Sequence, residues 1–280
     1  ETWKLAKMNL AIRGIAHNLG QKNASTFTED QHQDTIVQYI MANPPFNLKN
    51  WRGDDELLDD PRFYPYKPAI PPKSNANYAW ILHMLSKLDV EKGIAGFLLA
   101  NGALNAGSSG DDDDDDSGQD QYLIRKKILE NDKVEAIIVL PRDMFYTTDI
   151  SVTLWILNNN KKARSLNGRE LRDRTNEVLF MDLRRWDSNI EEYTIDKNKK
   201  KKKTVLTPDQ ILEVKKIYNN WQSVDCKDSK EYAISELYRS VKFEEIQEKN
   251  FNLAPSKYIE FIDHDLDIDF EKEMKRIQKE

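Results

Sequence analysis

The stretch that decides the fold is Ile36-Val37-Gln38-Tyr39-Ile40-Met41-Ala42-Asn43-Pro44-Pro45-Phe46. It opens with a short apolar run, residues 36–42, and ends in two prolines. Because proline has no N–H group and disfavours the helical conformation on its N-terminal side, a strand formed by this run must stop there. Functional residues of open α/β sheets lie at such carboxyl ends. The pattern therefore predicts a strand that delivers the turn 43–46 to a site.

The turn 43–46 has the groups needed to methylate a poor nitrogen nucleophile. The lone pair of the exocyclic amine of adenine is delocalised into the ring, so a catalyst must accept hydrogen bonds from both amine protons. The side-chain oxygen of Asn43 and the carbonyl of Pro44 can do this, and Pro44 and Pro45 stiffen the turn so that both acceptors are preorganised. Phe46 can pack against the base. We take Asn43, Pro44, Pro45 and Phe46 as candidate catalytic residues.

A turn of this composition also has a purely structural interpretation as a rigid connection after a strand. With proline near 5% of average usage, a chance match in a chain of this length is on the order of 1%. The position of the turn at the end of an apolar strand favours the functional interpretation.

The segments around the turn alternate between helical and strand patterns. Helices are predicted at 2–16, 77–89 and 121–131, and strands at 36–42, 94–99, 133–140, 151–158 and 177–183. This alternation predicts an α/β fold with a mostly parallel sheet over residues 1–185. Residues 105–120 consist largely of Gly, Ser and Asp, with an unbroken Asp run from Asp111 to Asp116. Such a segment cannot bury apolar area, so it is predicted to be a disordered insertion.

The last part of the chain, residues 186–280, is predicted to form a mainly helical extension that docks on other subunits. Thr207-Pro208 is a typical helix start, with Thr as N-cap and Pro at the first helical position. Helices are expected to about residue 222 and over 242–249. The basic run Lys199–Lys203 is assigned to a loop, either as a solvated turn or as a contact to phosphate.

Bulk properties narrow the possible classes of protein. The formal net charge of the 280 residues is −6, which argues against strong DNA binding by the chain alone. It does not argue against action on DNA when another subunit makes most of the contacts with the DNA. The single cysteine, Cys226, cannot form an internal disulfide, which suits a reducing cytoplasm. No segment approaches the roughly 18 apolar residues of a membrane span. The four histidines show no metal-ligand spacing, so no metal site is expected.

Several blocks in order resemble the modification (M) subunit of type I restriction systems, a family of N6-adenine DNA methyltransferases. The blocks are Thr2 to Ile15, Asp30-Gln31-His32, Ile40 to Asn47, Asn75 to Trp80, Leu99-Ala100-Asn101-Gly102 and Leu140-Pro141 with Met144 to Thr148. Together they cover most of the chain and are far more specific than the tetrapeptide 43–46.

The resemblance implies a class I, Rossmann-like S-adenosylmethionine-dependent fold and methyl transfer from S-adenosylmethionine to the N6 atom of adenine. The target base would be flipped out of the duplex. Phe145 or Tyr146 would stack on it, and the sequence does not decide between them. The implied partners are DNA, a specificity subunit, a restriction subunit and a second M subunit, all in the cytoplasm.

The resemblance also shows where the chain departs from the family. The Gly-rich cofactor loop is expected upstream of Glu1, so the sequence is interpreted as a catalytic domain truncated at its N-terminus. Ser25 stands where the family usually has an acid. Ser25, Thr26 and Asn43 are the expected cofactor-binding residues of this chain, and weak or no binding of S-adenosylmethionine by residues 1–280 alone is predicted.

Two other functions are compatible with the sequence. Asn-Pro-Pro-aromatic turns also occur in methyltransferases that act on protein glutamine or ribosomal RNA, where an amide or amine nitrogen poses the same chemical problem. Alternatively, the chain is a non-catalytic assembly module that docks through its C-terminal helices.

Overall fold

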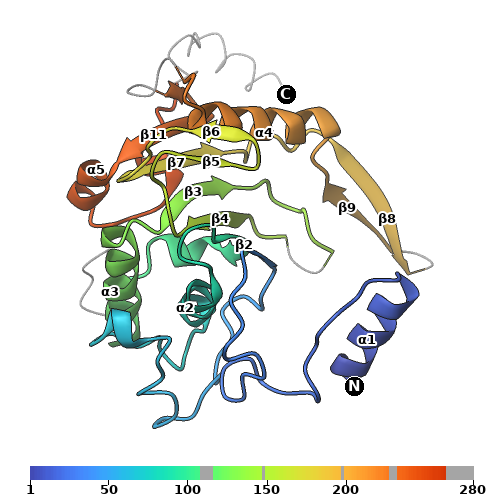
Figure 1. Ribbon diagram of the computed structural model, residues 1–280. Helices are drawn as coiled ribbons and strands as arrows, with labels where there is room; N and C mark the ends of the chain where they lie inside the picture. The colour runs from blue at the N-terminus through green and yellow to red at the C-terminus, as the bar shows by residue number, and fades with distance from the viewer. Residues whose placement is uncertain (108–115, 147–148, 197–198, 227–231, 263–280) are drawn as a thin grey trace, which may run out of the picture.

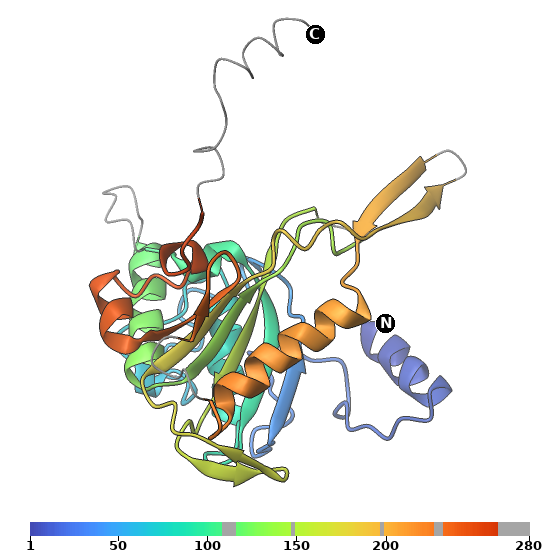
Figure 2. The ribbon, with the colours of Figure 1, turned by 90° about the horizontal axis from the view of Figure 1, so that it is seen from above.

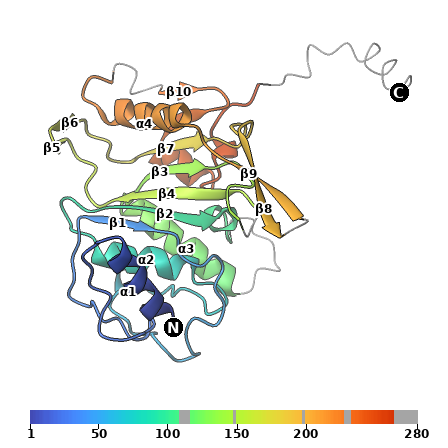
Figure 3. The same cartoon turned by 90° about the vertical axis from the view of Figure 1, so that its right-hand side faces the viewer.

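The computed structural model describes residues 1–107, 116–146, 149–196, 199–226 and 232–262. Its centre is a seven-stranded sheet with the strand order β1-β2-β4-β3-β7-β11-β10, which Figure 3 shows from the side. The strands are β1 (Tyr39–Ala42), β2 (Ile94–Ala100), β3 (Val134–Val139), β4 (Val152–Asn158), β7 (Glu177–Asp182), β10 (Ala233–Ile234) and β11 (Tyr238–Lys242).

The sheet is mixed, and most of its strands run in one direction, with β4 and β11 running in the other. β1 pairs in parallel with β2, and β3 pairs in parallel with β7. β4 lies between β2 and β3 and runs antiparallel to both. As a result, the carboxyl ends of β1, β2, β3 and β7 point to the same edge, which confirms the predicted α/β class.

Helices cover both faces of this sheet (Figure 1). One face packs against α2 (Asn77–Lys87), α3 (Asp116–Glu130) and α5 (Phe243–Glu248). The other face packs against α4 (Pro208–Gln222), whose Ile217 and Trp221 are buried on β3 and β7. The short 3-10 turns are η1 (Tyr64–Tyr66), η2 (Asn101–Leu104) and η3 (Pro255–Lys257), and α1 (Thr2–Ile12) lies apart from the sheet.

The helix start at Thr207-Pro208 is confirmed in detail. The Thr207 side chain accepts a hydrogen bond from the Gln210 backbone N–H, and the Gln210 side chain accepts one from the Thr207 N–H. This reciprocal capping box satisfies two of the donors that a helix N-terminus leaves unpaired.

The structure differs from the sequence prediction in three places. The assignment of Lys199–Lys203 to a loop is wrong, because these residues begin β9 (Lys199–Thr204), which pairs antiparallel with β8 (Ile190–Asp196). α3 begins at Asp116, inside the segment expected to be disordered, and residues 108–115 lie outside the described residues. The region predicted to be mainly helical also contains strands, and β11 extends the central sheet by pairing with β7.

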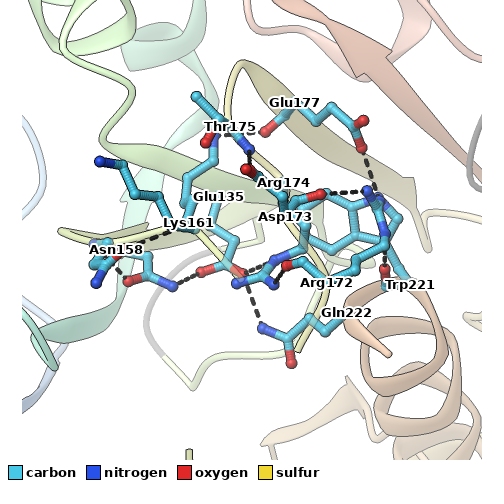
Figure 4. A network of polar contacts seen from close by, with 12 residues as sticks. Glu135, Asn158, Lys161, Arg172, Asp173, Arg174, Thr175, Glu177, Trp221 and Gln222 are labelled. Carbon is cyan, nitrogen blue, oxygen red and sulfur yellow. Dashed lines mark hydrogen bonds and ion pairs between the residues drawn. The ribbon is translucent and has the colours of Figure 1, made fainter. Parts of the chain in front are cut away.

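A smaller hairpin, β5 (Arg164–Leu166) with β6 (Arg169–Leu171), precedes a buried polar network at the end of the sheet opposite the turn 43–46. Glu135 on β3 is fully buried and accepts hydrogen bonds from Arg174, Asn158 and Gln222 (Figure 4). Because Gln222 belongs to α4, this network ties that helix to the sheet.

Candidate active site

The turn 43–46 leaves β1 at the edge of the sheet where the parallel strands end. β1 is aligned with β2 so that Ala42 lies opposite Phe97. Pro44 is buried and Phe46 is half-buried, whereas Asn43 is exposed. Pro44 therefore anchors the turn in the packed interior, while Pro45 is exposed and the Asn43 amide that was assigned to catalysis remains accessible.

Two asparagines beyond the turn fix its exit. Asn47 has a φ of 52°, in the left-handed region that asparagine tolerates better than most residues. Its N–H donates to Asn77 Oδ1 at 3.0 Å, and its Oδ1 accepts from Asn77 Nδ2 at 2.8 Å. Asn77 is buried at the start of α2. Sequence reasoning missed this pair, although the asparagines directly after Phe46 and at the helix start were a possible signal.

Phe145 comes to the same site from the loop between β3 and β4. Its ring lies 6.5 Å from the ring of Phe46, centroid to centroid, with an angle of 86° between the planes. An edge-to-face arrangement of this kind is a favourable aromatic contact. The structure thus brings Phe145 beside the candidate catalytic turn.

In the described part of the chain, Tyr146 contacts the β8–β9 hairpin and not the turn 43–46. Its ring packs edge-to-face on Tyr193 of β8, with centroids 4.7 Å apart, and its hydroxyl lies 3.3 Å from Lys203 Nζ of β9. Its backbone carbonyl accepts a hydrogen bond from the Tyr193 hydroxyl. Tyr146 therefore joins the loop to the β8–β9 hairpin, while Phe145 faces the turn.

A cavity of about 750 Å³ opens beside the turn and contains the expected cofactor residues. Asn43, Pro44, Ser25 and Thr26 all line it, together with the acidic side chains Glu29 and Asp30 and residues of α1 and α2. Its volume is within the roughly 300–1,000 Å³ that is typical of small-molecule sites.

Ser25 and Thr26 make hydrogen bonds that fix the local conformation of their segment. Ser25 Oγ accepts from the backbone N–H groups of Phe27 and Thr28, at 3.2 and 3.3 Å, so it caps a turn. The Thr26 carbonyl accepts from Arg62 at 3.0 Å. The ring of Phe27 is buried against Trp51 and Trp80, with centroid distances of 4.6 and 4.2 Å. These contacts hold the segment 25–27 against α2 at the wall of the cavity.

An ion pair forms part of the cavity wall. Lys87 Nζ lies 2.7 Å from Asp30 Oδ2 and also donates to the carbonyls of His32 and Gln33. Burial alone would raise the pKa of Asp30, but hydrogen bonds from Lys87 and the His32 N–H, with the charge of Lys87, lower it below its ordinary value. Asp30 is therefore a fixed negative charge at the cavity.

His83, also in the wall, is held neutral. Burial, followed by the charge of Arg62, lowers its pKa to about 4. Arg62 Nη1 lies 3.1 Å from His83 Nδ1, and because a guanidinium can only donate, Nδ1 accepts and the proton resides on Nε2. Trp80, which lines the same cavity, has a buried Nε1–H with no hydrogen-bond partner among the described residues.

The mixture of donors, acids and aromatic surface fits S-adenosylmethionine, which has an adenine ring, a ribose and a cationic sulfonium. Asp30 and Glu29 are already paired with Lys87 and Lys22, and they could also accept hydrogen bonds from ribose hydroxyls. Trp80 offers an apolar face and an unpartnered N–H. Within the described ranges, no three His, Cys, Asp or Glu side chains are grouped as metal ligands. In the same ranges, no helix combines the length and apolar character needed to cross a membrane.

Comparisons with known proteins agree with this geometry. Residues 1–266 match the family model described as N-6 DNA methylase. The chain is 35% identical over 258 residues to the type I restriction enzyme HindI methylase subunit of Haemophilus influenzae, covering 92% of this chain and 49% of the relative. It is 30% identical over 282 residues to the MjaIX methylase subunit of Methanocaldococcus jannaschii, covering 99% of this chain and 44% of the relative.

Solved structures give the same result. The crystal structure of the type I restriction-modification methyltransferase subunit from Streptococcus thermophilus superimposes with a TM-score of 0.70 at 26% identity, over 93% of this chain and 46% of that one. The EcoKI M protein, at 16% identity and a TM-score of 0.57 over 99% of this chain and 55% of that one, shows the same fold. The chain spans about half the length of the curated relatives it matches. By the extent of the match, the chain belongs to the N-6 DNA methylase family, among relatives that are methylase subunits of type I restriction enzymes.

Proposed function

We propose that this chain contains the target-base half of the active site of an adenine-N6 DNA methyltransferase, working as the modification subunit of a type I restriction-modification system. The observation that carries the proposal is the turn 43–46, which leaves a parallel strand beside a large cavity with Phe145 packed on Phe46. Membership of the N-6 DNA methylase family favours DNA over the protein and ribosomal RNA substrates that the same turn could serve.

In the proposed reaction, Asn43 Oδ1 and the Pro44 carbonyl accept hydrogen bonds from the two N6 protons of the flipped adenine. These contacts localise the nitrogen lone pair as it attacks, and because Pro44 is buried, the acceptor geometry is set before the base arrives. S-adenosylmethionine, when bound, supplies a methyl group already activated on its sulfonium. Ser25, Thr26, Asp30 and Asn43 are the residues of this chain that would line its site.

The proposed partners follow from the same assignment. DNA, a specificity subunit, a restriction subunit and a second modification subunit would assemble with this chain in the cytoplasm. The relatives are themselves named methylase subunits, which supports an activity shared between several chains. A net charge of −6 is compatible with an activity divided between chains, because a separate subunit would make most of the electrostatic contacts with DNA.

The test is transfer of a radiolabelled methyl group by the full-length protein to duplex DNA, ribosomal RNA and a glutamine-containing protein in parallel. We expect labelling of DNA only, and we expect Asn43→Ala to reduce it by roughly 100-fold or more, as for loss of one preorganised polar contact in an active site. Asn131→Ala, which alters an exposed asparagine after α3, serves as the matched control. DNA methylation that survives Asn43→Ala, or labelling of RNA or protein in its place, would refute the proposal.

A further inference from the structure

The β8–β9 hairpin concentrates positive charge in an acidic chain. Between Ile190 and Thr204 the sequence contains six lysines and three acidic residues, whereas the whole chain has a net charge of −6. Figure 2 shows that the hairpin projects away from the body of the molecule. A strand of this length extends about 20 Å at roughly 3.3 Å per residue, so its lysines are carried well beyond the sheet.

The two faces of β9 differ. Lys201 and Lys203 face the body, because Lys201 Nζ lies 3.8 Å from Asp149 and Lys203 Nζ lies 3.3 Å from the Tyr146 hydroxyl. Lys200 and Lys202 alternate with them and are exposed. Side chains on one face of the strand thus anchor the hairpin, and those on the other face are presented to solvent.

The exposed lysines of β9 form only a weak ion pair or none with the rest of the described chain. Lys200 Nζ lies 3.6 Å from Glu192, and the side chains of this pair are 72% and 53% exposed. Lys202 forms no ion pair with any residue in the described part of the chain. Exposed pairs of this kind contribute about 0–1 kcal/mol, so an anionic ligand could replace Glu192 at little cost.

The base of the hairpin is tied to the candidate active site. Thr204 N–H donates to the Asp143 carbonyl at 2.9 Å, and Tyr193 and Lys203 hold Tyr146. The next residue back along the chain is Phe145, which packs on Phe46. The hairpin therefore extends directly from the loop that carries Phe145, with Lys202 two residues and Lys200 four residues from Thr204 along β9.

We propose that the β8–β9 hairpin binds the phosphate backbone of the DNA that flanks the flipped adenine, with Lys200 and Lys202 as the contact residues. This inference rests on the proposed function, which places DNA at the turn 43–46. Two residues of a strand span about 6.7 Å, and one strand of a duplex carries a phosphate every ~3.4 Å of rise along the helix axis, so Lys200 and Lys202 can each reach a different phosphate. Lysine suits this task because phosphate contacts position the duplex without reading its sequence.

The test is binding of a short fluorescein-labelled DNA duplex to the native protein, followed by anisotropy between about 50 and 200 mM salt. The double variant Lys200→Gln/Lys202→Gln is expected to bind on the order of tenfold more weakly, and the slope of log affinity against log salt should decrease by about 1.8, or 0.9 for each lost contact. The loss should be equal for unrelated duplex sequences.

The matched control is Lys215→Gln/Lys216→Gln, which removes the same charge from exposed positions on α4. It should leave the salt slope near that of the unaltered protein, and thermal unfolding checks that both variants are folded. The assay contains no methyl donor, so its result does not depend on whether Asn43 is required for methyl transfer. DNA binding that the hairpin lysines do not alter would overturn the proposal, as would a hairpin variant that loses only its association with other protein subunits.

Discussion

Phe145 meets Phe46 edge-to-face, with 6.5 Å between the ring centroids and 86° between the ring planes. This contact joins the loop after β3 to the turn after β1. The neighbouring Tyr146 turns the other way, onto Tyr193 and Lys203. The two adjacent aromatic residues, which the sequence could not separate, therefore have different surroundings, and we propose Phe145 as the residue that stacks on the flipped base.

Phe145→Ala should weaken the capture of a flipped base. Loss of one base–aromatic stack is worth about 1–3 kcal/mol, or roughly a 5- to 150-fold loss of the flipped population. The measurement is the fluorescence of 2-aminopurine at the target position, which rises when the base leaves the duplex. Tyr146→Ala is the comparison, and a larger loss of fluorescence for this variant than for Phe145→Ala would reverse the assignment.

Asn77→Ala should impair the turn without touching the substrate. The substitution removes the acceptor of the Asn47 N–H and the donor to Asn47 Oδ1 in a buried position, which predicts a loss of about 1–3 kcal/mol in the free energy of unfolding. We also expect a lower kcat for methyl transfer, because the turn 43–46 loses its fixed exit. Urea unfolding and steady-state kinetics measure the two effects.

Asn220→Ala, at an exposed position on α4, provides the control for Asn77→Ala. It should change neither the stability nor kcat. If Asn77→Ala lowered stability but left kcat unchanged, the Asn47–Asn77 pair would be structural only.

Local pattern was sufficient for the buried strands of the sheet, but not for β10 and β11 at its edge or for the β8–β9 hairpin. The strands at 94–99, 133–140, 151–158 and 177–183 were predictable because each is an apolar run that the fold buries, and the helix at Thr207 because its cap is local. β9 has no apolar alternation, and it is a strand because β8 pairs with it residue by residue. A run of lysines does not reveal a partner strand.

The candidate site was likewise predictable from sequence only where its residues are consecutive in the chain. The turn 43–46 was recognisable because its chemistry is contained in four consecutive residues. The exit of the turn depends on Asn77, which lies 30 residues further along the chain, and the choice between Phe145 and Tyr146 depends on Tyr193, 47 residues after Tyr146. Such contacts are set by tertiary packing, which composition and periodicity do not specify.

The stability of the fold should depend on the protonation of His83. Its pKa is about 4 in the folded chain, against about 6.5 for an unperturbed histidine. Between these values the unfolded chain binds a proton that the folded chain does not, so the free energy of unfolding should fall as the pH is lowered from 6.5 to 4, by up to about 3 kcal/mol. Arg62 and Lys87 oppose protonation, and Asp30 and Asp60 favour it.

His83→Asn keeps an acceptor near the position of Nδ1 but cannot be protonated, so its stability should vary less over this range. Urea unfolding at pH 7, 6 and 5 makes the comparison. The pKa values of Asp30 and Asp60 are lowered below 3.8, so these carboxylates affect stability below the window and do not obscure it. Equal pH dependence in the two proteins would show that His83 is not the responsible group.

The buried network around Glu135 should be intolerant of losing one charge but tolerant of losing both. Glu135 and Arg174 are each 0% exposed, and Arg174 Nε lies 3.1 Å from Glu135 Oε1 (Figure 4). Glu135→Ala leaves a buried guanidinium without its counter-charge, which predicts a loss of about 3–5 kcal/mol in the free energy of unfolding. The double substitution Glu135→Leu/Arg174→Met removes both charges at similar volume, and it should be markedly more stable than the single variant.

Chemical denaturation of the single and double variants tests this coupling, with Glu130→Ala as the control. Glu130 pairs with Lys126 at 3.9 Å on the exposed side of α3, so its loss should cost less than about 1 kcal/mol. Because Gln222 of α4 also donates to Glu135, at 2.8 Å, the single variant should in addition loosen α4, with faster amide hydrogen exchange near its C-terminus. A double variant as unstable as Glu135→Ala would mean that hydrogen bonds to the carboxylate, rather than the uncompensated charge of Arg174, determine the stability of this end of the sheet.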